Sequence, residues 1–181
     1  VLGGVVSALN VLCAKGDTVL IHTPAYIGFT HTLENNGYRA VHSPLVLDDN
    51  NVWRMDFEDM ERKILSERIH TLVFCSPHNP CGRVWEHWEL EKLMELCKKH
   101  DVYVISDEIW SDLTLEGFHH IPLQSISEDA KMRTVGIYAP SKTFNLAGLV
   151  GSYRIVYNKR IRDLMDKEAK LTQYNHRNVL S

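Results

Sequence analysis

The sequence predicts an α/β fold in which a mainly parallel sheet is sandwiched by helices. Segments with helical spacing of apolar residues alternate with short apolar runs along the chain, which is the pattern of parallel strands joined by helices. Two of the runs, Thr71–Cys75 and Val102–Ser106, are apolar at nearly every position. Each is therefore expected to be buried on both faces of the sheet, with helices above and below it.

The amino-terminal part of the chain is expected to begin with a helix and then alternate. The first helix is expected at Val5–Ala14, where an amphipathic pattern starts, with Gly16 at a C-cap position. Changes in the apolar period then predict strand Thr18–His22, helix Gly28–Asn35, strand Ala40–Ser43 and helix Asp56–Leu65.

The carboxyl-terminal part continues the same alternation. Strand Thr71–Cys75 leads into a loop at residues 76–82 that contains two prolines and a glycine, which is a strong turn signal. The remaining patterns predict helix Trp85–His100, strand Val102–Ser106, strand Thr134–Tyr138, strand Ser152–Val156 and helix Asn158–Gln173.

The length of 181 residues predicts one domain, residues 1–181, since a single core is typical of roughly 100–150 residues and persists somewhat beyond. The chain starts at Val1 without methionine and stops abruptly at Ser181, so we expect a fragment or a processed chain.

Composition excludes several classes of function. The formal net charge of −3 gives no electrostatic basis for binding nucleic acid or an anionic membrane. No segment reaches the ~18 consecutive apolar residues of a membrane span, and no signal peptide is recognised. The four cysteines show no CxxC pair, so we expect reduced thiols, a cytoplasmic protein and no metal site: Cys13, Cys75, Cys81 and Cys97.

Polar residues that follow predicted strands are the candidates for a ligand site, because ligands of open parallel sheets collect at the carboxyl ends of the strands. Each candidate has an ordinary alternative: an acid caps a helix, an Asn-Pro pair marks a turn, and a loop lysine is a solvated charge. Their order along the chain is more specific than any one of them: Tyr26, Asn79, Asp107, Ser141 and Lys142.

Four motifs carry a family resemblance across almost the whole chain. They are Thr23-Pro24-Ala25-Tyr26, the stretch Cys75 to Trp85 (CSPHNPCGRVW), Ser106-Asp107-Glu108-Ile109, and the stretch Ala139 to Gly148 (APSKTFNLAG). In this order they resemble the fold-type I enzymes that depend on pyridoxal 5′-phosphate (PLP), and within them the cystathionine β-lyase and C-S lyase branch. The resemblance implies the large domain of a PLP-dependent transferase-like fold.

The resemblance also implies a role for each motif residue. Lys142 would form a Schiff base with PLP and act as base and acid at the substrate's α-carbon, and we expect burial to keep its amine neutral part of the time. Asp107 would face the pyridine nitrogen, Asn79 would donate to the phenolic oxygen, and Tyr26 would stack on the ring.

The phosphate of the cofactor would lie at the start of the first helix. There Gly4, Val5 and Val6 would offer unpaired backbone N–H groups, and the Ser141 hydroxyl would add a donor. The alternative for Gly3 and Gly4 is a flexible chain end.

Two positions depart from the broader aminotransferase pattern. Trp110 stands where many aminotransferases place a tyrosine that bonds the phenolic oxygen, and Val150 stands where an arginine usually binds the phosphate. Arg154 is close by in sequence, but its place in a predicted strand favours a structural role. These departures favour the lyase branch.

The implied activity is β-elimination from cystathionine or cysteine-type amino acids, with transamination as the first alternative. A second alternative is a catalytically incompetent fragment or binding module, because family members extend past both ends of this chain, with an amino-terminal segment and a carboxyl-terminal small domain. The family also implies a homodimer for the longer protein. A nucleotide-binding α/β domain is disfavoured, since no GxGxxG or P-loop pattern follows a predicted strand.

Overall fold

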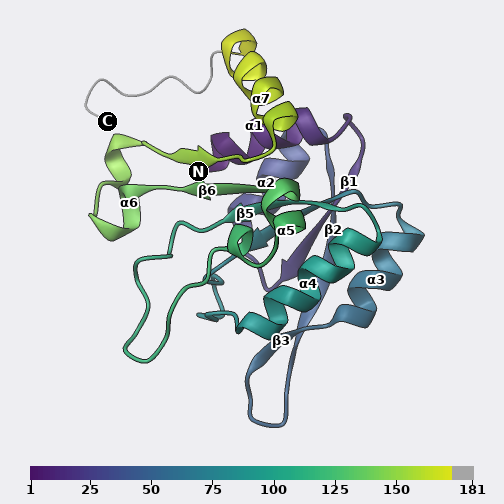
Figure 1. Cartoon of the computed structure of the whole chain (residues 1–181), viewed down its shortest axis with the longest axis vertical. Helices are drawn as coiled ribbons and strands as arrows, with labels where there is room; N and C mark the ends of the chain where they lie inside the picture. The colour runs from purple at the N-terminus through teal and green to yellow at the C-terminus, as the bar shows by residue number, and fades with distance from the viewer. Residues whose placement is uncertain (173–181) are drawn as a thin grey trace.

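A seven-stranded mixed sheet forms the middle layer of the computed structural model, which describes residues 1–172 (Figure 1). The strand order is β3-β2-β1-β4-β5-β6-β7. The five inner strands are parallel, whereas β3 pairs antiparallel with β2 and β7 pairs antiparallel with β6. The strand bounds are β1 Thr18–Thr23, β2 Arg39–Leu47, β3 Trp53–Met55, β4 Thr71–Cys75, β5 Tyr103–Asp107, β6 Thr134–Tyr138 and β7 Tyr153–Ile155.

Helices cover both faces of this sheet. One face packs against α1 (Leu2–Leu12), α2 (Ile27–Asn35) and α7 (Lys159–Thr172). The opposite face packs against α3 (Phe57–Ser66), α4 (His87–Lys99) and α5 (Glu128–Arg133). The short helical turns are η1 Leu123–Ser125, α6 Pro140–Thr143 and η2 Ala147–Leu149.

The inner strands explain why their sequences are apolar at almost every position. In β4, Leu72 and Phe74 belong to the core beneath α3 and α4, whereas Val73 and Cys75 belong to the core beneath α1 and α2. All four side chains are buried. Successive side chains of a strand point to opposite faces, so a strand covered on both sides needs apolar residues at both. The predicted fold class, a mainly parallel sheet between helices, is confirmed.

Trp85 is not part of helix α4 (His87–Lys99), although the sequence predicts a helix that starts at this residue. The indole is fully buried and its N–H donates to the Cys75 carbonyl oxygen at 2.9 Å. Helix α4 starts two residues later, after a capping box in which the Glu86 and Glu89 side chains bond each other's backbone N–H groups. The spacing between Trp85 and the apolar residues of α4 fits a helix, so the predicted helix begins two residues too early.

Other boundaries differ by a few residues, and the short elements β3, η1, α5, α6 and η2 are absent from the prediction. Helix α1 starts at Leu2, earlier than the predicted Val5, and β2 is longer than predicted. Edge strand β3 and helix α5 are too short to show a period: β3 has three residues and α5 has six. The predicted end of the last helix at Gln173 lies outside the described residues.

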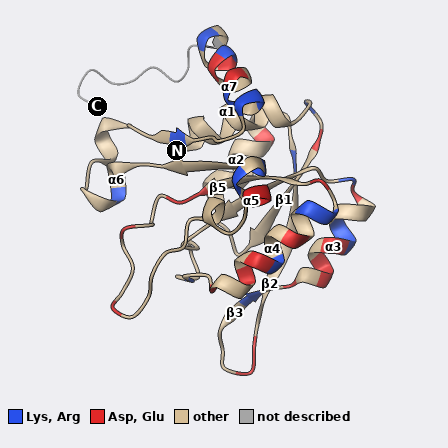
Figure 2. Cartoon of the chain, viewed as in Figure 1, with Lys and Arg blue, Asp and Glu red and all other residues tan. Residues whose placement is uncertain are grey.

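Charged side chains of both signs are interleaved on the outer helices α3, α4 and α7 (Figure 2). Within residues 1–172, no helix combines the length and the apolar composition that crossing a membrane requires. The face of α3 shows the pattern clearly, with Arg62 and Lys63 both paired to Asp59.

Candidate functional site

The predicted site residues follow four neighbouring strands of the sheet. Tyr26 comes after β1, Asn79 after β4, Asp107 ends β5, and Lys142 comes after β6. Because these strands are adjacent and parallel, in the order β1-β4-β5-β6, their carboxyl ends share one edge of the sheet. The register aligns Cys75 with Asp107 and Asp107 with Ile137, which brings the three strand ends level.

Asp107 is a buried carboxyl group with few protein partners. Within residues 1–172, its side chain accepts one hydrogen bond, from the Ile109 N–H to Oδ1 at 3.1 Å. Burial raises the pKa of Asp107 to about 6, and the nearby Glu108 charge acts in the same direction, against the Ile109 hydrogen bond and the positive charge of the Val1 amino group. A cationic ligand here would stabilise the carboxylate, so Asp107 is suited to binding a protonated ring nitrogen.

The start of α1 lies close to this carboxyl group, since the negative charge of Asp107 acts on the pKa of the Val1 amino group, which burial lowers. The prediction that Val5 offers an unpaired N–H is wrong, because this N–H donates to the Val1 carbonyl oxygen at 3.0 Å. Val6 lies a further position into the helix. The first-turn N–H groups without an intrahelical acceptor belong instead to Leu2, Gly3 and Gly4.

Lys142 lies on α6, and its side chain is exposed rather than buried as expected. Its ammonium nitrogen is 5.1 Å from the centroid of the Trp110 ring, a cation–π contact. The next residue, Thr143, donates from its hydroxyl to Asp112 Oδ2 at 2.8 Å. Both contacts join α6 to the loop that follows β5. Ser141 precedes Lys142 and is half-buried.

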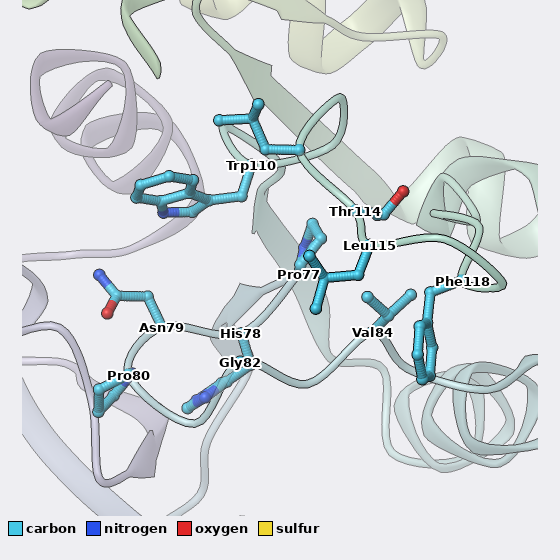
Figure 3. Close-up of a pocket in the computed structure, with 11 residues that line it drawn as sticks. Pro77, His78, Asn79, Pro80, Gly82, Val84, Trp110, Thr114, Leu115 and Phe118 are labelled. Carbon is cyan, nitrogen blue, oxygen red and sulfur yellow. The ribbon is translucent and has the colours of Figure 1, made fainter. Parts of the chain in front are cut away.

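Asn79 and Trp110 line the same pocket, which has a volume of about 420 Å³ (Figure 3). Among residues 1–172, no hydrogen bond of the Asn79 side-chain amide is found, so the amide is available to a ligand. The wall is mainly apolar and comes from the loops after β4 and β5: Pro77, His78, Asn79, Pro80, Gly82, Val84, Trp110, Leu113, Thr114, Leu115 and Phe118.

Backbone and thiol contacts hold the loop that carries Asn79. The Asn79 N–H donates to the Cys75 sulfur at 3.5 Å, and burial raises the pKa of that thiol to about 12, so it stays neutral. The loop closes on itself through the His78 N–H to the Arg83 oxygen at 2.7 Å and the Gly82 N–H to the His78 oxygen at 2.8 Å. Asn79 is therefore presented by a tight turn.

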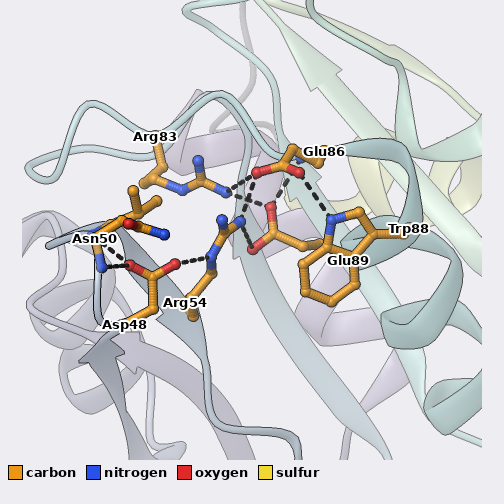
Figure 4. A network of polar contacts seen from close by, with 8 residues as sticks. Asp48, Asn50, Arg54, Arg83, Glu86, Trp88 and Glu89 are labelled. Carbon is orange, nitrogen blue, oxygen red and sulfur yellow. Dashed lines mark hydrogen bonds and ion pairs between the residues drawn. The ribbon is translucent and has the colours of Figure 1, made fainter.

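An ion-pair network anchors the far end of this loop (Figure 4). Glu89 of α4 is fully buried and pairs through one oxygen with Arg83 and through the other with Arg54, at 3.2 Å. Arg54 on β3 also pairs with Asp48 at 2.9 Å and with Glu86 at 2.6 Å. The network connects the β2–β3 hairpin, the Asn79 loop and the first turn of α4.

Tyr26 is the N-cap residue of α2 and is 42% exposed. The ring packs edge-on against Phe29, with centroids 5.6 Å apart. Gly28 permits this position, because a Cβ atom there would lie 2.3 Å from Cε1 of Tyr26. The exposed face of the ring is available for stacking.

Two further residues belong to the site but were not predicted as members. Trp110 was noted only as a departure from a pattern, although it contacts Lys142 and lines the pocket. Glu108 follows Asp107 directly and is fully buried, and an acid at the buried end of a strand was the available signal. Arg154, by contrast, bonds Asp166 and Ser7, which supports its structural role.

Comparison with known proteins gives consistent results. The chain is 41% identical over 181 residues to cystathionine β-lyase PatB of Bacillus subtilis, which covers 98% of this chain and 45% of PatB. It is 28% identical over 172 residues to an aspartate aminotransferase of the same organism, covering 95% of this chain and 42% of that protein.

The crystal structure of cystalysin from Treponema denticola, which contains a pyridoxal 5′-phosphate cofactor, superposes with a TM-score of 0.92 at 35% identity. It covers 99% of this chain and 45% of that chain. The chain thus spans about half the length of the relatives it matches. Residues 2–172 match the model of the aminotransferase class I and II family, and the chain belongs to this family.

Proposed function

We propose that this chain is the PLP-binding part of a PLP-dependent C-S β-lyase that acts on cystathionine or cysteine-type amino acids. The observation that carries the proposal is the convergence of Asp107, Asn79 and Lys142 at one edge of the sheet, on adjacent strand ends. These residues supply a buried carboxyl group, an unpaired amide and an exposed amine, which fit the chemically distinct parts of PLP.

When bound, PLP supplies a conjugated ring that withdraws electrons from the substrate's α-carbon. The Asp107 carboxylate would bind the ring nitrogen and keep its proton in place. The Asn79 amide would donate to the phenolic oxygen, and the exposed Tyr26 ring would lie against the cofactor ring. The N–H groups of Leu2 to Gly4 and the Ser141 hydroxyl would bind the phosphate.

Lys142 would bind the cofactor covalently and would move the proton at the substrate's α-carbon. Loss of that proton lets the bond between the β-carbon and sulfur break, so that a thiol leaves. The C–S outcome is favoured by the likeness to PatB, a cystathionine β-lyase, at 41% identity.

Two other functions remain candidates. An aminotransferase is supported by the 28% identity to an aspartate aminotransferase, and the same three residues would serve that reaction. A PLP-binding module without turnover is the other alternative. For the longer protein we propose a cytoplasmic homodimer, as the family resemblance implies.

Titration of the chain with PLP tests the cofactor assignment. We expect visible absorbance from PLP bound covalently to lysine, and Lys142→Ala should remove it. Lys99→Ala is the matched control, because Lys99 is an exposed lysine paired with Glu61 far from the sheet edge. Absence of this absorbance in the wild-type chain, or its persistence in Lys142→Ala, would contradict the assignment.

A test of the reaction type requires a longer protein that contains this chain and has the length of the relatives. Release of pyruvate from cystathionine supports the lyase, and amino transfer to a keto acid without pyruvate supports the aminotransferase instead.

A further inference from the structure

Helix α6 presents Lys142 but has little packing of its own. It consists of four residues, none of them buried. A helix this short is not stable by itself, so its position has to come from contacts with other segments. Those contacts converge on a neighbour that the proposed chemistry leaves without a role, Glu108.

Glu108 is a fully buried carboxylate with both oxygens bonded. Oε1 accepts from the Ser106 hydroxyl at 2.9 Å and from the Leu123 N–H at 3.2 Å. Oε2 accepts from the Tyr138 hydroxyl at 2.8 Å and lies 2.7 Å from His120 Nε2. Because a carboxylate only accepts, His120 donates through this nitrogen. The four donors come from β5, β6, η1 and the loop after β5.

These bonds close the loop of residues 109–122 at its base. Glu108 precedes the loop, and its carboxylate bonds His120 and Leu123 at the other end, so it holds the two ends of the loop together. The closed loop touches α6 at two points, Trp110 against Lys142 and Asp112 against Thr143. It also forms the wall of the pocket opposite Asn79.

A second route leads from the same carboxylate to α6 along β6. Tyr138 is the last residue of β6 and stands two positions before Pro140, the first residue of α6. Its ring stacks on Tyr153 with centroids 5.4 Å apart, and its hydroxyl is fixed by Glu108. Burial, together with the Glu108 charge, raises the pKa of Tyr138, so the hydroxyl remains a donor.

We propose that Glu108 is a positioning residue for Lys142: it anchors the end of β6 and closes the 109–122 loop, and these two segments hold α6 in place. The inference rests on the proposed function for its catalytic meaning. The placement of α6 by Glu108 is a property of the protein without ligand and can be measured separately.

The test compares His120→Ala with His120→Gln, and Tyr138→Phe with the wild type. The Gln side-chain nitrogen is as many bonds from Cα as His Nε2, so His120→Gln can restore the donor to Glu108. Tyr138→Phe removes one donor without changing the ring. Glu91→Gln is the control, since Glu91 is an exposed acid on α4. Amide hydrogen exchange at residues 144–146, whose N–H groups donate to the carbonyl oxygens of α6, and the PLP dissociation constant are measured for each variant.

We expect faster exchange at residues 144–146 in His120→Ala and Tyr138→Phe. We also expect PLP dissociation constants raised roughly 10-fold in these two variants, the scale of one lost hydrogen bond to a charged group. His120→Gln and Glu91→Gln should match the wild type in both measurements. A purely structural role would not be rescued by His120→Gln.

Unchanged amide exchange in both His120→Ala and Tyr138→Phe overturns the inference, whether or not the chain binds PLP. If the wild type binds PLP, unchanged PLP affinity in these two variants overturns the inference as well. If the wild-type chain takes up no PLP, the proposed function fails for this chain. The amide exchange of residues 144–146 then decides the positioning role alone. If His120→Ala does not fold, Tyr138→Phe gives the same decision.

Discussion

Asp107 is a buried carboxyl group whose ionisation lowers the stability of the folded chain. Its position was predicted from an acid at the end of a buried strand, but its burial depends on how α1 and the neighbouring strands pack. That burial raises its pKa to about 6, above the value of 3.8 for a free side chain. The folded chain therefore holds the Asp107 proton more tightly than the unfolded chain does, and ionisation above pH 6 disfavours folding.

Asp107→Asn is expected to stabilise the chain at pH 8. The carboxyl group of the wild type is stabilising only while protonated, so stability falls as the pH rises from the unfolded pKa of about 3.9 through the folded pKa. A shift of this size corresponds to about 2–3 kcal/mol. Urea unfolding should show Asp107→Asn more stable at pH 8 by this order and equal to the wild type below pH 4, where both side chains are neutral. A variant less stable at pH 8 would contradict the argument.

Gly28→Ala separates the role of Tyr26 from stability. The added Cβ would lie 2.3 Å from Cε1 of Tyr26, so the half-exposed ring must move. Alanine also favours the helix, by up to about 1 kcal/mol relative to glycine. We expect unchanged or slightly raised thermal stability together with PLP binding weakened several-fold. Unaltered PLP affinity would show that the position of the Tyr26 ring does not matter for the cofactor.

At the scale of elements, long periodic segments were predictable and short edge elements were not. The inner strands and the helices α3, α4 and α7 follow from apolar spacing alone. Strand β3 lies at the edge with a single buried residue, Met55, and α5 buries only Ala130, so neither leaves a period in the sequence. Trp85 satisfied the helix pattern but binds a carbonyl group of β4 instead.

Glu89 is expected to be essential for the loop that presents Asn79. Glu89→Ala would leave Arg54 and Arg83 without their buried acceptor, and breaking a buried pair of this kind costs about 3 kcal/mol or more. Chemical unfolding measures the loss. Glu91→Ala, on the exposed face of the same helix, should change stability by less than about 0.5 kcal/mol. Similar losses in both variants would mean that the network contributes no more than helix propensity.

At the scale of the whole molecule, the sheet topology explains why the strand-end residues could be predicted. The pocket wall could not be predicted, because loops form it. The family's motifs and the rule that ligands bind at strand carboxyl ends predicted Tyr26, Asn79, Asp107 and Lys142 as site residues, and all four lie at or just after the ends of adjacent strands. The pocket could not be foreseen, because its wall combines residues 77–84 with residues 110–118, which loop conformation alone brings together. The bonding of Val5 N–H depended on the starting residue of α1, which sequence patterns locate poorly.

Lys142 is proposed as the lysine that PLP selects at this edge of the sheet. Incubation of the chain with PLP, reduction with borohydride and mass spectrometry of the peptides test it most directly. One predominant adduct is expected, on Lys142, and Asp107→Ala should strongly reduce it. Adducts spread over the surface lysines in proportion to their exposure, or equal labelling of Lys142 in Asp107→Ala, would contradict it.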